Sequence, residues 1–506
     1  MTKLQLLPML RILCMMSIFL PLSCASQGSV YQINEGLEAE TLTLTPGKNT
    51  SEINVTWYGD TEDGKSGKVI FASRSAMRSG KFPASTQTIN AEGIDASAGK
   101  ISHKATLTGL APNTEYAYSV SSDGIHFSKV YIYKTPAAGR FTFVAVGDPQ
   151  VTEPGVSPDA EGVVGGYQEK NSAKTTKQGW QDTVNAITKQ VPNVRFIAGV
   201  GDQIDRNLVS ELGRPETSSD PHEIKYAHFF APNALRSIPF APAVGNHESR
   251  TSYGFIYHYN IPNEQSLTSI PTGQSGSRHE MESKGNYYYI YNNALFVVLN
   301  TAAYPRNKDE AASIITDHFD KTFTAATEKH KGQYQWLFVQ THKSIASLAD
   351  HAADRDIQYY VEAGFGQLMD TYHVDFVLAG HDHIYARSYP LYDGKRVDGK
   401  ADDRITDAGG TVYFTLNSSS GQKFYAEFVP DIKNNTEYPY FEDETKGSAE
   451  LMSGKVPYPV NVYHQDYKPM FLEIDVSDNT VIFKAYEVQD DLTVKVVDTY
   501  TVTKTK

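Results

Sequence analysis

The chain has 506 residues, a hydrophobic content of 40% and a formal net charge of −13. This length exceeds what one hydrophobic core usually serves, so we expect two or more domains. The negative charge argues against sequence-independent binding to a nucleic-acid backbone, and it means that an anionic substrate must meet a local positive site.

The first 24 residues predict an export signal. Lys3 and Arg11 precede an apolar run at 12–22, which is too short to span a bilayer but suits the core of a signal peptide. Cys24 resembles the lipidated cysteine of a bacterial lipoprotein, and plain secretion is the alternative. We therefore expect a protein of the bacterial periplasm or cell surface, lipid-anchored through Cys24 or secreted. Both cysteines of the chain lie in this segment, which excludes structural disulfides and thiolate metal sites elsewhere.

Residues 29–137 predict an all-β sandwich of the immunoglobulin or fibronectin type III kind. Short alternating runs such as 53–58 are separated by turns rich in Gly, Asn, Asp and Pro. The stretch 105–116 resembles the turn and following strand of fibronectin type III modules, in which Tyr116 would close one end of the sandwich. His103 and His126 are solitary, and we expect them at the surface or in turns. This domain is expected to pack against or orient the next one.

Residues 138–506 predict a layered α/β domain, because strands alternate with helices. Its sheets are expected to be mixed, since a hairpin at 287–299 and a β-rich tail at 471–502 accompany the alternating units. The predicted strands are 141–146, 194–200, 240–244, 336–340 and 374–378, and the predicted helices are 180–191, 221–236, 308–330 and 354–372.

Polar side chains follow all five of these strands. They are Asp148 with Gln150, Asp202, Asn246 with His247, His342, and His381 with His383. One histidine at a strand end is usually structural, but matching groups at five strand ends indicate a shared site. Oxygen and imidazole donors without thiolate suit Zn, Mn or Fe. Apart from His247, the seven ligating side chains are too many for one ion, and they divide well between two metal ions roughly 3.5–4 Å apart if one carboxylate bridges.

Three motifs resemble those of the calcineurin-like metallophosphoesterases. They are Gly-Asp-x-x-Asp-Arg at 201–206, Gly-Asn-His-Glu at 245–248 and Gly-His-x-His at 380–383. The likeness covers 141 to about 421, and the stretch 380–388 together with the preceding β-domain is similar to the layout of purple acid phosphatases. This resemblance implies a four-layer α/β/β/α sandwich.

The resemblance also implies a role for each site residue. Asp148, Gln150, Asp202 and His383 would hold one metal ion, and Asp202, Asn246, His342 and His381 would hold the other. Asp205 would orient His247, while Arg206 would contact phosphate or be an ordinary surface charge. Two positions depart from the pattern. Asp205 stands where purple acid phosphatases carry the Tyr that colours their iron site, so a purple centre is not expected. Gln150 stands where relatives often have His, which leaves the identity of the metal and its affinity open.

The expected function is hydrolysis of small-molecule phosphate esters by an exported enzyme, with monoesters favoured as in acid phosphatases. A metal-bridged hydroxide would attack phosphorus in line with the leaving group, and His247 would act as general acid. Hydrolysis of phosphodiesters or nucleotides at the same site is the first alternative. An exported binding protein with a structural metal site is the second.

Overall fold

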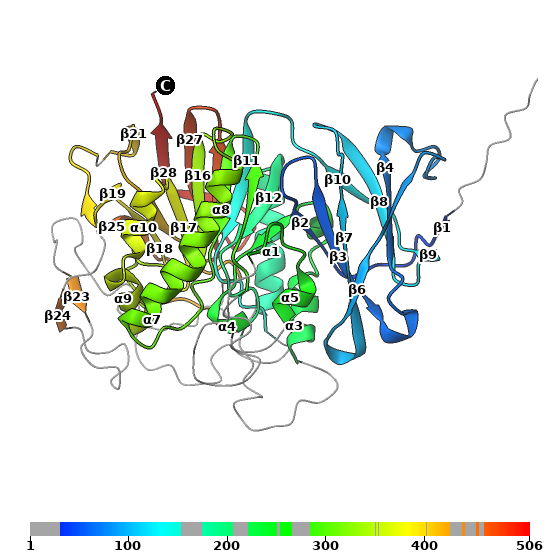
Figure 1. Ribbon diagram of the computed structural model, residues 1–506, viewed down its shortest axis with the longest axis horizontal. Coiled ribbons are helices and arrows are strands. Elements are labelled where there is room, and N and C mark those ends of the chain that lie inside the picture. The colour runs from blue at the N-terminus through cyan, green and yellow to red at the C-terminus, as the bar shows by residue number, and fades with distance from the viewer. Residues whose placement is uncertain are drawn as a thin grey trace, which may run out of the picture.

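The computed structural model describes residues 31–152, 175–205, 221–249, 254–265, 284–349, 351–352, 354–400, 402–421, 423–425, 438–440, 452–454 and 460–505. Figure 1 shows an N-terminal β-rich part (blue to cyan) beside a larger α/β part (cyan to red). Within the described residues, no helix is both long and apolar enough to span a bilayer. The predicted signal segment and Cys24 lie outside the described residues, as does Arg206, so export and lipidation stay predictions.

The β-domain (residues 31–135) consists mainly of two four-stranded sheets. One contains β2 (Glu40–Pro46), β3 (Ile53–Asp60), β7 (Lys100–Leu107) and β6 (Glu92–Asp95), and the other contains β10 (Tyr131–Lys134), β8 (Glu115–Ser121), β4 (Lys68–Ser73) and β5 (Gln87–Asn90). A short parallel pair is formed by β1 (Gln32–Ile33) and β9 (His126–Phe127). Apolar side chains of both sheets, including Leu44, Val55 and Val69, form one core. The predicted β-sandwich is therefore confirmed.

Two residues of this domain bear on its expected details. The hydroxyl of Tyr116 accepts a hydrogen bond from the backbone N–H of Ala111 at 2.8 Å, which is the arrangement of a tyrosine corner. The expectation that His103 lies at the surface is wrong. Its ring is fully buried and stacks on Trp57, with ring centroids 5.3 Å apart. Room for the ring exists because Gly67, whose added Cβ would overlap it, has no side chain.

The α/β domain contains two seven-stranded sheets. Sheet I has the order β13 (Phe240–Pro242), β12 (Val194–Gly199), β11 (Phe141–Val146), β26 (Met470–Val476), β27 (Thr480–Val488), β28 (Val494–Thr503) and β21 (Arg404–Thr406). Sheet II has the order β14 (Tyr287–Tyr291), β15 (Ala294–Val298), β16 (Trp336–Lys343), β17 (Phe376–Gly380), β22 (Val412–Thr415), β18 (Tyr385–Ser388) and β25 (Val460–His464). Both sheets are mixed, as expected. In each, parallel strands from the alternating units join antiparallel strands from the hairpin or the C-terminal tail.

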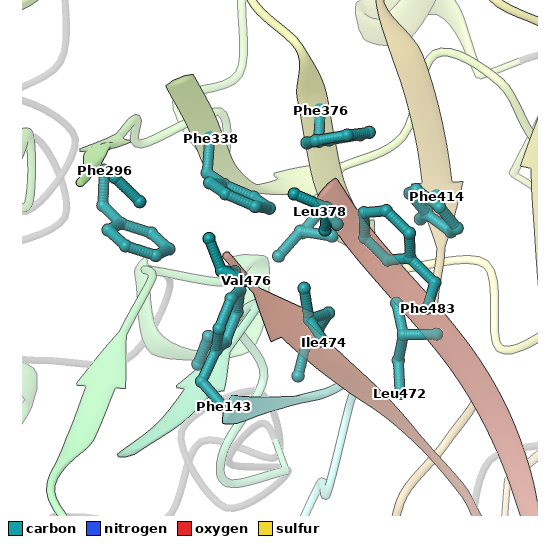
Figure 2. Packing of buried hydrophobic residues seen from close by; sticks show 14 of the residues in the cluster. Phe143, Phe296, Phe338, Phe376, Leu378, Phe414, Leu472, Ile474, Val476 and Phe483 are labelled. Carbon is teal, nitrogen blue, oxygen red and sulfur yellow. The ribbon is translucent and has the colours of Figure 1, made fainter. Parts of the chain in front are cut away.

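An aromatic layer fills the space between the two sheets. Figure 2 shows Phe143 of sheet I facing Phe296 and Phe338 of sheet II, and these rings pack edge to face with centroids 5.3 and 5.5 Å apart. Edge-to-face contact is favourable for aromatic pairs beyond the area that they bury. The layer holds the sheets at a fixed separation.

Helices cover the outer face of each sheet. Sheet I is covered by α1 (Thr176–Gln190), α3 (Pro221–Phe229) and α5 (Gly254–His258). Sheet II is covered by α7 (Lys308–Ile314), the π-helical segment η5 (Ile315–Asp320), α8 (Lys321–Lys329), α9 (Arg355–Glu362) and α10 (Phe365–Thr371). The predicted four-layer α/β/β/α arrangement is confirmed.

Three of the predicted helices are not regular α-helices over their whole length. The segment 221–236 divides into α3 and the 3-10 turn η4 (Asn233–Arg236), because Pro232 between them cannot continue a helix. The segment 354–372 breaks at Gly364, whose φ is 102°. The segment 308–330 stays helical but passes through the π-helical turns of η5, which the sequence pattern did not predict.

A buried ion pair joins the two sheets. Arg387 on β18 is fully buried, and its Nε donates to Asp498 Oδ2 on β28 at 2.7 Å. A second bond runs from Arg387 Nη2 to Asp498 Oδ1 at 3.1 Å, and the guanidinium lies 4.2 Å from the Tyr500 ring centroid. These interactions raise the pKa of Arg387 above its ordinary value despite burial. The pair therefore anchors the strand that directly follows the Gly-His-x-His motif.

Replacing Asp498 with Ala should destabilise the protein by about 3 kcal/mol, because the buried Arg387 loses both bonds to Asp498 and keeps the exposed Asp403, 2.9 Å from its Nη2, as counter-charge. The shift in the urea unfolding midpoint measures this cost. Asp475→Ala is the matched control, since it breaks a pair with Arg140 at the surface, where the Arg140 side chain is 68% exposed. That change should cost at most about 1 kcal/mol. Equal shifts for the two variants would contradict the anchoring role of Arg387.

Candidate metal centre

The polar residues that follow the five predicted strands meet at one place in the α/β domain. Strands β11, β12 and β13 run parallel in sheet I, and β16 and β17 run parallel in sheet II. Groups after parallel strands gather at the carboxyl edge of a sheet. The structure brings the seven candidate ligands together from both sheets: Asp148, Gln150, Asp202, Asn246, His342, His381 and His383.

Asp148 lies at one end of this cluster. Its carboxylate is fully buried, and Oδ2 accepts the backbone N–H of His381 at 2.9 Å. Its Oδ1 is 3.6 Å from His383 Nε2 and 4.0 Å from His342 Nδ1. The other nitrogen of His383, Nδ1, is 2.9 Å from the carbonyl oxygen of Lys423, which orients the ring so that Nε2 faces the cluster.

Asp202 lies at the centre. Its Oδ2 accepts from Gln150 Nε2 at 3.0 Å and is 3.4 Å from His342 Nε2. The same His342 nitrogen is 2.9 Å from Asn246 Oδ1, while His342 Nδ1 is held 2.9 Å from the Val200 carbonyl. One oxygen atom thus contacts groups from both sheets, as a bridging ligand would require.

The backbone at these positions is strained. Five of the seven residues have positive φ angles, between 39° and 72°, although none is glycine: Asp148, Gln150, Asp202, His381 and His383. Non-glycine residues in this region cost of order 1–3 kcal/mol each, and such residues concentrate at functional sites. The loops therefore direct these side chains toward the cluster at a cost in conformational energy, and packing alone does not explain that cost.

Two glycines make the close approach possible. An added Cβ at Gly245 would overlap the Asp202 carboxylate, and one at Gly380 would overlap that of Asp148. Both glycines belong to the motifs recognised in the sequence, so their role in this chain is to let backbone lie against a carboxylate.

The donor set fits metal ions. Gln150 Oε1 is buried with no hydrogen-bond partner, and His381 Nε2 is buried with its nearest carboxylate, that of Asp354, at 3.8 Å. Buried polar atoms normally have a partner, so these two atoms indicate a missing one. Ligand atoms of Asp202, His342 and His381 lie within 4.8 Å of one another. Burial lowers the pKa of His381 and His383, which keeps both rings in the neutral form that binds metal.

Electrostatics within the cluster reflect its crowded carboxylates. Burial, helped by the charge of Asp202, raises the pKa of Asp148 to about 7. Burial opposes charge on His342, but the neighbouring carboxylates of Asp202 and Asp148 outweigh it and raise the pKa of His342 to about 9. In the metal-free protein, a proton on His342 therefore offsets part of the negative charge.

Binding of metal should release this proton. His342 is protonated in the metal-free protein below about pH 9, and it must be neutral to coordinate. Metal affinity should accordingly rise with pH between 7 and 9. Calorimetric titration with Zn²⁺ at pH 7.5 in buffers of different ionisation enthalpy should show about one proton released. A binding heat that does not depend on the buffer would contradict this assignment.

His247 and Asp205 form a pair beside the cluster. His247 Nδ1 is 2.8 Å from Asp205 Oδ1, which leaves Nε2 facing the side chains of Gln150 and Asp202 at 3.4 and 3.5 Å. Burial raises the pKa of Asp205, but the hydrogen bond and charge of His247 outweigh it and lower that pKa to about 2. Burial lowers the pKa of His247 below its ordinary value. The carboxylate is therefore ionised and fixes the imidazole orientation.

Comparison with known families agrees with this geometry. Residues 141–385 match the calcineurin-like phosphoesterase family, and residues 39–135 match the N-terminal domain of purple acid phosphatases. Residues 141–385 thus form a calcineurin-like phosphoesterase domain. The two matched stretches make up most of the chain, although the predicted domain limits at 1–24, 29–137 and 138–506 stay predictions.

Curated relatives of the chain are distant. An uncharacterized protein of Mycobacterium tuberculosis is 26% identical over 341 residues, which cover 64% of this chain and 59% of the relative. A protein of Arabidopsis thaliana named "Probable inactive purple acid phosphatase 27" is 21% identical over 398 residues, which cover 74% of this chain and 60% of the relative. The chain thus spans about three fifths of the length of the curated relatives that it matches.

Solved structures share the fold of this chain. Purple acid phosphatase PPD1 from yellow lupin has a TM-score of 0.58 at 16% identity, with coverage of 92% of this chain and 75% of that one. PhoD has a TM-score of 0.54 at 12% identity, with coverage of 93% and 91%. The family match implies metal ions, and these structures show the shared fold.

Several residues of the candidate site were not predicted from the sequence. Glu248 accepts the backbone N–H groups of Gly245 and Asp202 at 2.8 and 2.9 Å, so it joins two motif loops. His351 stacks on His381 with ring centroids 4.2 Å apart, and its Nδ1 is 2.8 Å from Asp354. Glu248 stood inside a quoted motif and could have been found there. His351 and Asp354 lie in a loop well after β16, and no motif pointed to them.

Asp382, the unassigned middle residue of the His-x-His motif, holds this loop. It accepts the backbone N–H of Ala349 at 2.8 Å and that of His351 at 2.7 Å, and it also bonds the Ser347 hydroxyl. The motif therefore supplies two candidate ligands and fixes a third histidine beside them.

Proposed function

We propose that the protein is an exported hydrolase of small-molecule phosphate esters that acts with two metal ions, with phosphomonoesters as the favoured substrates. The observation that carries the proposal is the convergence of seven oxygen and imidazole donors beside the hydrogen-bonded pair of Asp205 and His247. Such a donor set suits Zn, Mn or Fe.

The proposal divides the donors between two positions. Asp148, Gln150, Asp202 and His383 would hold one ion, and Asp202, Asn246, His342 and His381 would hold the other. Bound there, the ions would supply activation of water and neutralisation of the phosphate charge.

The protein's own groups handle the leaving group. His247 Nε2 faces the cluster because Asp205 holds Nδ1 at 2.8 Å, so a proton on Nε2 is placed for transfer to the departing oxygen. A positioned general acid of this kind is typically worth 10²–10⁴-fold in rate. Asp205 also stabilises the charge of the protonated ring, which favours the proton-donating form.

A local positive charge supports the binding of an anion. The protein carries a formal net charge of −13, so the site must attract phosphate by its own cations. Lys423 lies next to the site, because its backbone carbonyl oxygen is 2.9 Å from His383 Nδ1. The charge of its side chain lowers the pKa of Asp148 and of Asp205. Its Nζ is 5.9 Å from the centroid of the Tyr425 ring, which in turn packs against His383. Lys423 joins the metal ions as a source of positive charge.

The test is a substrate screen on protein reconstituted with Mn, Zn or Fe. Phosphate release from monoesters, lost after chelation and restored by metal, is the expected result. Faster hydrolysis of diesters or nucleotides would favour the alternative activity at the same site. Fully metallated protein that hydrolyses none of the three classes would replace the proposal with a binding role.

Export rests on the sequence of residues 1–24, which lie outside the described residues. The proposal places the protein in the periplasm or at the cell surface of a bacterium, with a lipid on Cys24. Cell fractionation of the wild type and of Cys24→Ser tests both parts. A variant that stays bound to the membrane through lipid would overturn lipidation at Cys24.

A further inference from the structure

One carboxylate of the α/β domain, that of Glu223, takes part in the contact with the β-domain. Glu223 on α3 accepts hydrogen bonds at Oε1 from the Tyr58 hydroxyl on β3 at 3.2 Å and from the Ser97 hydroxyl at 3.0 Å. Its Oε2 is 2.9 Å from His258 Nε2 on α5. Burial raises the pKa of Glu223, but the charge and hydrogen bond of His258 outweigh it and hold the pKa below its ordinary value. Glu223 is therefore an ionised group shared by both domains.

Aromatic rings enclose this contact. The His258 ring is fully buried and stacks on Tyr58, with centroids 4.5 Å apart and planes 18° apart. On another side it packs against Tyr226 at 4.1 Å. Charged hydrogen bonds gain strength when water is excluded, so the contact fixes α3 against the β-domain.

The same helix reaches the candidate site. Lys225, two residues after Glu223, is buried, and its Nζ donates to the Asp205 carbonyl at 3.3 Å. Its charge also lowers the pKa of Asp205. Residues two apart on a helix point in different directions. One turn of α3 thus contacts the β-domain through Glu223 and the His247–Asp205 pair through Lys225.

We propose that the β-domain is a positioning element for His247. Tyr58 and Glu223 hold α3, Lys225 on α3 holds Asp205, and Asp205 orients the imidazole that donates the proton. These residues act through one another and do not touch substrate. The inference rests on the proposed function, because it assigns a role to the domain in the proton transfer of that reaction.

The test compares two monoesters on full-length, metal-loaded protein. An alkyl phosphate needs a proton on its leaving oxygen, whereas a nitrophenyl phosphate releases a stable anion that needs none. For Tyr58→Phe and Glu223→Gln, kcat on the alkyl ester should fall about tenfold, since small misplacements of a catalytic group have effects of this order. Activity on the nitrophenyl ester and metal content should stay within about twofold of wild type, because the metal ligands are untouched.

Tyr118→Phe is the matched control. It also removes a hydroxyl bond between the domains, from Tyr118 to the Arg236 carbonyl at 2.6 Å, but that bond does not involve α3. Both esters should be hydrolysed by this variant as by wild type. Equal losses on both esters in Tyr58→Phe, or no loss on either, would overturn the positioning role.

A second measurement does not depend on turnover. The imidazole N–H of His247 that is bonded to Asp205 should give a downfield proton resonance, assigned by its absence in His247→Ala. Tyr58→Phe should shift or broaden this resonance, and Tyr118→Phe should leave it in place. An unchanged resonance in Tyr58→Phe overturns the inference, whether or not the wild-type protein hydrolyses any ester. Wild-type protein that hydrolyses no ester would refute only the proposed function.

Discussion

Replacing Asp202 with Asn is expected to abolish metal binding and hydrolysis together. The change keeps the shape of the side chain but removes the charge at the oxygen that contacts groups from both sheets, including Gln150 and His342. It also removes the main charge that raises the pKa of His342. Loss of a partner that only supports a ligand costs roughly 10–100-fold in metal affinity, and loss of the bridging ligand should cost more.

Elemental analysis of the purified variant, together with phosphate release, measures both effects. Asp317→Asn is a suitable control, because among the described residues the Asp317 carboxylate on η5 forms an ion pair only with the exposed Lys321, at 2.9 Å. Its metal content and activity should equal those of wild type. A fully metallated and active Asp202→Asn protein would overturn the bridging role.

His247→Ala should lower kcat on an alkyl phosphate by about 10²–10⁴-fold, the usual contribution of a general acid. The ligand side chains are unchanged, so the variant should bind as much metal as wild type. Burial lowers the pKa of His247, so the ring becomes protonated at a more acidic pH than a free imidazole does. In a series of kcat values across pH, wild type should gain activity on the alkyl ester toward acidic pH, and the variant should not.

An unchanged kcat in His247→Ala would exclude it as the proton donor. Asp205→Asn offers a second check on the same group. It retains a hydrogen-bond partner for Nδ1 but removes the charge that favours the protonated ring. Its loss of activity should be smaller than that of His247→Ala and should likewise be confined to esters with a poor leaving group.

The centre of the site could be predicted because its signals are local. An apolar run followed at once by Asp, Asn or His marks a strand that delivers a polar group to the sheet edge, and this holds for Asp148, Asp202 and His381. The alternation of strands with helices was enough to predict a layered α/β domain, and the family resemblance of the motifs implied its four layers. The likeness of the β-domain to fibronectin type III modules stays a prediction.

Features that depend on distant segments could not be predicted in this way. His103 was placed at the surface because a solitary polar residue in a strand usually faces water, whereas the space beside Gly67 receives its ring. The position of His351 depends on Asp382, whose carboxylate accepts the backbone N–H of His351 from a loop that lies earlier in the sequence. No sequence pattern connects these two residues. Tyr58, Glu223 and His258 come from three segments, each of which is unremarkable by itself.

The candidate ligands come from two sheets, and the aromatic layer between those sheets therefore has a second consequence. Phe143 lies on β11 of sheet I, the strand that leads to Asp148, and Phe338 lies on β16 of sheet II, the strand that carries His342. Because interiors are packed as closely as crystals, the volume of these rings sets how far apart the two halves of the site stand. The size of the side chains in this core therefore sets the distance between the ligands of sheet I and those of sheet II. That distance helps to determine the radius of the ions that the two sets of ligands can bind.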